Sequence, residues 1–186
     1  MEMTRATHSP SRSAERLQIK AARREDMPTI AQLVRSSADW YRPFVDEKDM
    51  SEHEVDEAWE SKNYKRRSFY LGTLGTKAIG TISTQRLGSY AYLGYIYLDV
   101  EHVGNGHGAS LMRFAEEQLR ETDAQGMALI AHPEAAWAKK AYLKYGFKIA
   151  ATEKEDVLAW QNGALKGYYE EGFQLYLFDF ARRERN

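Results

Sequence analysis

The chain has 186 residues, of which 43% are hydrophobic and 28% are charged, and its formal net charge is −1. This length and composition predict a globular chain with a hydrophobic core and exclude global disorder. The near-neutral charge lacks the basic excess of most nucleic-acid-binding domains, so no nucleic-acid partner is expected. No apolar run approaches the roughly 18 residues of a membrane span, so no membrane association is expected.

The sequence contains no cysteine. This excludes disulfides, cysteine-based metal sites and a cysteine nucleophile. No apolar signal-peptide core follows the first residues, so the cytoplasm is the expected location. Residues 1–16 are polar and lack periodicity, which predicts a disordered leader before a single domain at 17–186.

The predicted elements begin with a strand at 17–23 and a helix within 24–40. Asp26 is the expected cap of this helix, and Pro28 lies in its first turn. A second, strongly acidic helix is expected at 46–60. The remaining predicted elements are, in order, strands at 68–74, 77–86 and 90–100, a helix at 107–122, a strand at 127–131, a helix at 134–145 and strands at 147–153 and 173–180.

This order of elements indicates the fold class. The early strands follow one another as a meander, whereas the later strands alternate with helices. Such an α/β (α+β) pattern predicts a mixed, twisted central sheet of about seven strands with helices on both faces.

The stretch "HVGNGHGASLM" at 102–112 joins a strand to a helix through Gly104, Gly106 and Gly108. Free amides at a helix N-terminus, with glycines that allow close approach, form an anion site. The spacing excludes a P-loop and departs from the G-x-G-x-x-G dinucleotide fingerprint. A tight turn without a ligand is the alternative interpretation.

Two motifs on these elements resemble the GNAT superfamily of N-acyltransferases. In the first, the family has Arg or Gln, two residues, Gly, one residue, then Gly or Ala; Val103 stands at the Arg or Gln position, followed by Gly106 and Gly108. In the second, "AAWAKKAYLKYGF" at 135–147, Ala135 replaces the usual Asn. The matching residues of this second motif are Ala138, Tyr142, Gly146 and Phe147.

The resemblance implies an N-acetyltransferase that moves the acetyl group of acetyl-CoA to a primary amine of a small molecule or protein. Transfer would be by direct attack through a tetrahedral intermediate. The sheet would splay between two parallel strands, with unpaired backbone groups for the pantetheine arm and the amides of 103–109 around the pyrophosphate. No metal is implied. The cofactor-binding residues implied are Leu98, Asp99, Val100, Val103, Gly104, Asn105, Gly106, His107, Gly108, Ala109, Ala135, Ala138 and Tyr142.

Tyr142 is the catalytic residue that the resemblance implies, as the acid that protonates the leaving thiolate. The alternative is a core residue, because Ala138, Ala141, Tyr142 and Tyr145 form an amphipathic stripe. The base stays open: Asp99 and Glu101 are the nearest carboxylates, and alternation places Tyr95, Tyr97 and Asp99 on one strand face. No histidine spacing suggests a metal site.

The acceptor is not specified by the sequence. The acidic segment could attract a cationic amine through Glu47, Glu52, Glu54, Asp56 and Glu57, and the aromatic loop at 160–173 could form the other wall. The absence of the usual residues at Val103 and Ala135 keeps a second function open, a degenerate CoA-binding or regulatory module. A toxin that acetylates aminoacyl-tRNA is a third, which the charge disfavours. Monomer and homodimer are both compatible.

Overall fold

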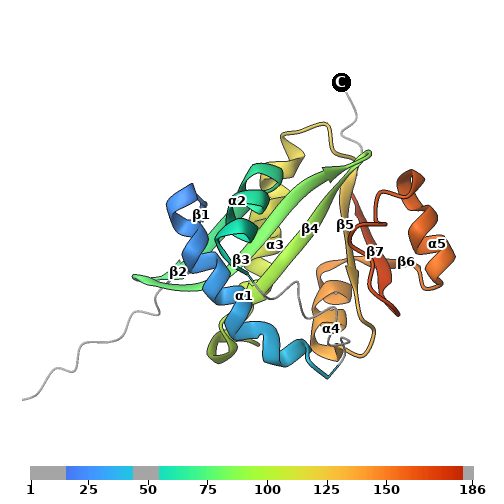
Figure 1. Cartoon of the computed structure of the whole chain (residues 1–186). Helices are drawn as coiled ribbons and strands as arrows, with labels where there is room; N and C mark the ends of the chain where they lie inside the picture. The colour runs from blue at the N-terminus through green and yellow to red at the C-terminus, as the bar shows by residue number, and fades with distance from the viewer. Residues whose placement is uncertain (1–15, 44–54, 182–186) are drawn as a thin grey trace, which may run out of the picture.

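The computed structural model describes residues 16–43 and 55–181 (Figure 1). Seven strands form one sheet in the order β1-β2-β3-β4-β5-β7-β6. All neighbouring strands are antiparallel except β4 and β5, which are parallel. The predicted mixed sheet of seven strands is therefore confirmed. The strands are β1 (Gln18–Ala21), β2 (Ser68–Leu74), β3 (Lys77–Leu87), β4 (Tyr90–Leu98), β5 (Gly126–Ala131), β6 (Lys148–Ala151) and β7 (Gln174–Asp179).

The two parallel strands separate soon after they meet. They pair only at Ala91 with Met127 and at Tyr92 with Ala128, a contact that we call the seam. Figure 1 shows β4 and β5 close together at one end and diverging toward the other. Residues 93–98 of β4 therefore pair with β3 on one side and face a gap on the other.

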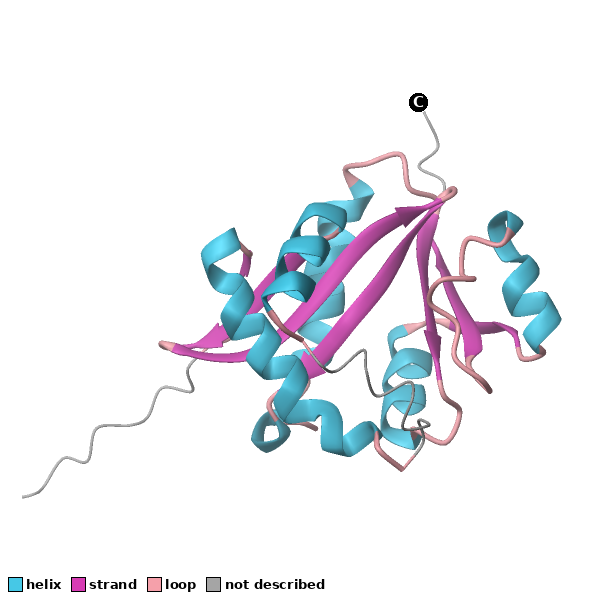
Figure 2. Cartoon of the chain, in the orientation of Figure 1, coloured by secondary structure: helices cyan, strands magenta, loops and turns pink. Residues whose placement is uncertain are grey.

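Helices cover both faces of the sheet (Figure 2). They are α1 (Met27–Tyr41), α2 (Glu57–Arg66), α3 (His107–Arg120), α4 (Ala136–Tyr145) and α5 (Lys154–Ala159). Leu111, Met112 and Ala115 of α3 pack with Met127 and Leu129 of β5 in the largest core cluster. The intervening Ala128 packs with Val157 of α5 instead. Because successive strand residues point to opposite faces, α3 and α4 lie on one face and α1, α2 and α5 on the other.

A bulge interrupts β4 beside the gap. The register between β3 and β4 shifts where Thr81 pairs with Tyr97 and Ser83 with Gly94. Tyr95 adopts φ +46°, a left-handed conformation that is rare for a tyrosine. The extra residue reverses the alternation, so Tyr92, Tyr95 and Tyr97 all face the layer of α1, α2 and α5.

Several predicted boundaries were wrong. The predicted strand 90–100 ends at Leu98, because a 3₁₀ turn at Val100–His102 follows and Asp99 caps it. The side chain of Asp26 accepts a hydrogen bond from the Arg23 amide, so it caps the 3₁₀ turn Arg24–Asp26 rather than α1.

The second predicted helix is also displaced. Asp56 accepts a hydrogen bond from the Trp59 amide at 2.8 Å and caps α2, which begins at Glu57. The helix ends at Arg66, beyond the predicted end at 60. Most of the predicted acidic helix 46–60 lies outside the described residues, as does nearly all of the predicted leader. The short helix α5 between β6 and β7 was not predicted. No helix within the described ranges is long and apolar enough to cross a membrane.

Candidate functional site

A cavity of about 590 Å³ lies at the gap between β4 and β5. Its walls come from α2, residues 92–97 of β4, residues 129–132 at the end of β5, α4 and the loop that precedes β7. Leu129 belongs to the core under α3 and α4, whereas Tyr92 belongs to the core under α5. Side chains from both layers of helices therefore line the cavity.

Three of the predicted site residues line this cavity, namely Ala135, Ala138 and Tyr142. Ala135 and Ala138 are buried at the start of α4, where the Ala135 carbonyl accepts the amide of Lys139. The Tyr142 ring packs edge-on against Phe147 and Tyr176, with ring centroids 6.1 and 5.8 Å away. Tyr142 is thus both a core residue and a wall of the cavity.

The glycine loop lies beyond the end of β4, outside the cavity lining. Gly104 and Gly106 have φ of +88° and +81°, and no atom lies within 4 Å of a Cβ built on either. Gly108 has an ordinary φ, and a Cβ there would be 3.6 Å from Leu98 Cδ1. No hydrogen bond from the amides of 104–109 to another described residue is recorded, whereas the Ser110 amide closes the first helical turn onto Gly106. The loop thus presents exposed backbone donors at the N-terminus of α3.

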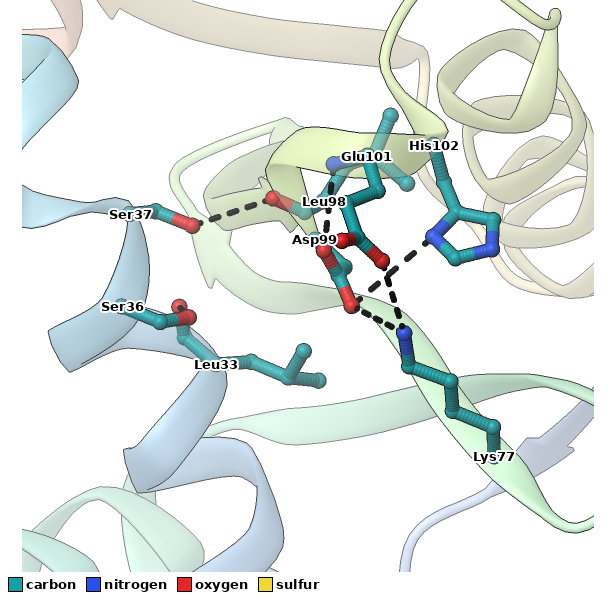
Figure 3. Close-up of polar contacts among 8 residues, drawn as sticks. All are labelled: Leu33, Ser36, Ser37, Lys77, Leu98, Asp99, Glu101 and His102. Atoms are coloured by element: carbon teal, nitrogen blue, oxygen red, sulfur yellow. Dashed lines mark hydrogen bonds and ion pairs between the residues drawn. The ribbon is translucent and has the colours of Figure 1, made fainter.

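Two backbone groups at the end of β4 already have partners. The Leu98 carbonyl accepts a hydrogen bond from Ser37 Oγ at 3.1 Å, and the Asp99 amide donates to Ile79 at 2.8 Å. Figure 3 shows the first of these bonds joining α1 to the strand end. These two atoms are therefore not among the backbone groups that could pair with a pantetheine arm. Along residues 93–98, β4 does not pair with β5.

Asp99, Glu101 and His102 form a cluster that the sequence did not predict. Their potential ligand atoms lie within 4.8 Å of one another. Lys77 Nζ lies 2.9 Å from the Asp99 carboxylate and 3.3 Å from that of Glu101 (Figure 3). The hydrogen bond from Lys77 holds the pKa of the Asp99 carboxyl below its usual value. Both carboxylates of the cluster are thus paired with Lys77, and neither lines the cavity.

The charged residues in the cavity wall, namely Lys62, Arg66, Arg67 and Glu170, were missed by the sequence analysis. Arg67 lies in a basic run at the end of α2, which looks like an ordinary solvated face. Glu170 is the one carboxylate among the described residues that line the cavity. It comes from the aromatic loop 160–173, whose Tyr168 and Phe173 form part of the wall. Gly94, a glycine inside an aromatic strand, was the available signal of a close approach.

The acidic residues predicted for the acceptor site do not line the cavity where they are described. Asp56 is used as a helix cap, and Glu57 is exposed on the first turn of α2. Glu47, Glu52 and Glu54 lie outside the described residues. His132 does line the cavity, and its Nδ1 accepts a hydrogen bond from the Glu134 amide at 3.3 Å.

Comparison with known proteins identifies the family. The model of the acetyltransferase (GNAT) family matches residues 31–147, which is more than half of the chain. A search of curated protein sequences finds no match.

Solved structures support the same fold. The PaiA N-acetyltransferase of Thermoplasma acidophilum in complex with coenzyme A has a TM-score of 0.67 at 18% identity, covering 89% of this chain and 99% of its own. A GNAT-family acetyltransferase of Staphylococcus aureus Mu50 has a TM-score of 0.67 at 16% identity, covering 88% of this chain and 99% of its own. The ribosomal-protein-S18-alanine N-acetyltransferase of Escherichia coli has a TM-score of 0.63 at 16% identity, covering 92% of this chain and 98% of its own.

Proposed function

Because the chain belongs to the GNAT family of acetyltransferases, we propose that it transfers the acetyl group of acetyl-CoA to a primary amine of a small molecule or protein. The observation that carries this proposal is the cavity at the gap between β4 and β5, which is lined by residues from both layers of helices. Two substrates can then meet within the sheet, one from each face. The cytoplasm, and a monomeric or homodimeric state, stay predictions.

The donor would bind on the α3 and α4 face. The exposed amides of 104–109 and the positive end of the α3 dipole suit a pyrophosphate. Positive φ at Gly104 and Gly106 turns the backbone there without any side chain over the loop. The open edge of β4 would receive the amides of the pantetheine arm, in the way that a further strand would pair.

In the reaction the amine nitrogen forms a bond to the acetyl carbon, and the bond from that carbon to sulfur breaks. An alkylamine has a pKa of about 10.4, so it must first lose a proton near pH 7. Asp99 is a weak base, because Lys77 stabilises its charged form. Glu170 is placed better to accept the proton, directly or through water, because it lines the cavity. Tyr142 would protonate the leaving thiolate.

A second function, CoA binding without catalysis, is favoured by two substitutions in the motifs. Val103 supplies no charge to the pyrophosphate, and Ala135 supplies no side-chain amide. A hydrogen bond to a charged group contributes about 1.5–3 kcal/mol. The loss of one such bond weakens binding about tenfold or more without abolishing it.

Two measurements separate these functions. Calorimetry with acetyl-CoA tests the donor site, and a panel of primary amines, assayed for release of free CoA, tests transfer. We expect both binding and amine-dependent release, with reactions lacking amine as the control. Binding without release across the panel would support the non-catalytic module, and absence of binding would contradict both functions.

A further inference from the structure

Arg67 lies in the wall of the cavity, within a cage of aromatic rings. Its Cζ is 4.9 Å from the ring centre of Tyr95, 5.2 Å from that of Tyr168 and 5.9 Å from that of Tyr92. Two of these rings belong to β4 and the third to the loop before β7. Cation–π contacts at such distances stabilise the guanidinium. Because Tyr92 and Tyr168 belong to the core under α5, Arg67 lies on the opposite face of the sheet from α4 and Tyr142.

The guanidinium is held in one position. Arg67 Nε donates to Asn63 Oδ1 at 3.2 Å, and Asn63, itself buried, donates to the Trp59 carbonyl at 3.1 Å. A Cβ built on Gly94 would lie 2.7 Å from Arg67 Nη1, so the glycine provides the room for this group against β4. Tyr168 is fixed in turn by its hydroxyl, which donates to Gln85 at 2.9 Å.

The charge of Arg67 has no carboxylate partner among the described residues. Its Nη1 is buried and donates no hydrogen bond to any of the described residues. Lys62 and Arg66 also line the cavity, whereas Glu170 is the one described carboxylate there. Arg67 is partly buried, and a partly buried cation is stabilised when a bound anion supplies its counter-charge.

We propose that the acceptor is a small amine that also carries a carboxylate, and that Arg67 binds this carboxylate. The proposal rests on the proposed acetyl transfer, whose acceptor class it specifies. With Nε bonded to Asn63 and Nη1 buried against β4, the carboxylate accepts charge-assisted hydrogen bonds from the Nη2 side of the guanidinium, whose planar, fixed donors an ammonium group does not reproduce. With its carboxylate at Arg67, the acceptor directs its amine toward the gap between β4 and β5, where Glu170 and Tyr142 line the cavity.

The first experiment compares acceptors on the unchanged protein. The standard L-amino acids, β-alanine and 4-aminobutyrate are each assayed against the corresponding carboxamide, which has nearly the same size and no negative charge. We expect at least one carboxylate to be acetylated with kcat/KM about 10- to 100-fold above that of its amide. Equal or faster acetylation of the amides would overturn the proposal and leave the proposed transferase activity intact.

The second experiment changes the arginine. Arg67→Met should raise KM for the carboxylate acceptor about 10- to 100-fold and leave the amide within about threefold. Arg67→Lys, which keeps the charge and loses the planar guanidinium, should give an intermediate KM. Arg23→Met is the matched control, because Arg23 is exposed and its one ion pair among the described residues is with Glu25 on the surface. An unchanged KM in Arg67→Met would also overturn the proposal.

Calorimetric binding of the same pairs separates this proposal from the proposed function. Tighter binding of a carboxylate than of its amide, lost in Arg67→Met, would support the site even if no CoA were released. CoA release with amines that bind without regard to a carboxylate would contradict the site and support the transferase. No binding of any member of the panel would contradict the site.

Discussion

Tyr142 is at once part of the hydrophobic core and part of the cavity wall. Its ring contacts Phe147 and Tyr176, and these contacts depend on the ring alone. Its hydroxyl is the group that a proton transfer would use. The two roles can therefore be separated by removing one oxygen atom, which leaves the packing of α4 on the sheet intact.

We expect Tyr142→Phe to lower kcat by about 100-fold, the usual contribution of a positioned acid. The melting temperature and the Kd for acetyl-CoA should stay near those of the unchanged protein. Steady-state kinetics, thermal unfolding and calorimetry measure the three quantities. Turnover at the original rate would show that Tyr142 is a core residue only.

Val103 stands where an arginine or glutamine would reach the pyrophosphate, and its side chain is 36% exposed. Val103→Arg should tighten acetyl-CoA binding about tenfold, by adding one charged hydrogen bond. Ile149→Arg is the matched control, since Ile149 is similarly exposed, at 38%, and lies on the edge strand β6. Equal changes in Kd for both variants would indicate an unspecific charge effect and contradict the assigned role of position 103.

The glycine loop is an element whose conformation depends on individual residues. Gly106 precedes α3 in the left-handed region, whereas Gly108 lies inside the first turn with an ordinary φ. The same added methyl group is therefore strained at one position and accommodated at the other. This difference explains why the family motif accepts alanine at the second position and requires glycine at the first.

Gly106→Ala should raise the Kd for acetyl-CoA about tenfold, because a left-handed alanine costs about 1–2 kcal/mol. Gly108→Ala, whose Cβ meets only Leu98 at 3.6 Å, should bind within about threefold of the unchanged protein. Calorimetry on the pair measures both values. A larger loss in Gly108→Ala than in Gly106→Ala would mean that the alignment of the loop is wrong.

Individual elements also show how much of the structure could be predicted from the sequence. The strand, loop and helix around Gly104 could be predicted because glycine spacing and apolar periodicity are local signals. The bulge in β4 could not, since Tyr95 adopts a conformation that tyrosine disfavours, and its ring packs against Trp59, Phe69 and Arg67 from other elements. Arg67 was missed for the same reason: its cage combines residues from α2, β4 and a loop about 100 residues later.

At the scale of the whole molecule, two parts of one sheet meet at the seam. Strands β1 to β4 lie on one side and β5, β7 and β6 on the other. Beside the seam, Tyr90 at the start of β4 donates a hydrogen bond of 2.5 Å to Asp179 at the end of β7. This bond, together with burial, raises the pKa of Tyr90 to about 12. It ties the two parts together where the gap closes.

Tyr90→Phe should lower the free energy of unfolding by about 1 kcal/mol near pH 7, a small value because Asp179 is exposed. A raised folded-state pKa means that this stabilisation is complete below pH 10 and disappears as the pH rises toward 12. Denaturant unfolding between about pH 8 and about pH 11 should therefore show the two proteins converging. A difference that stays constant over this range would contradict the assignment, and Asp179→Asn is the control that removes the charge.

The open edge of β4 has a consequence for isotope exchange. Amides on the seam are held between two strands, whereas alternate amides along residues 93–98 have no neighbouring strand on the β5 side. These amides should take up deuterium faster than those of β3, although they lie in the centre of the sheet. A donor that pairs with this edge would slow their exchange, so a single strand reports, residue by residue, whether the gap is filled.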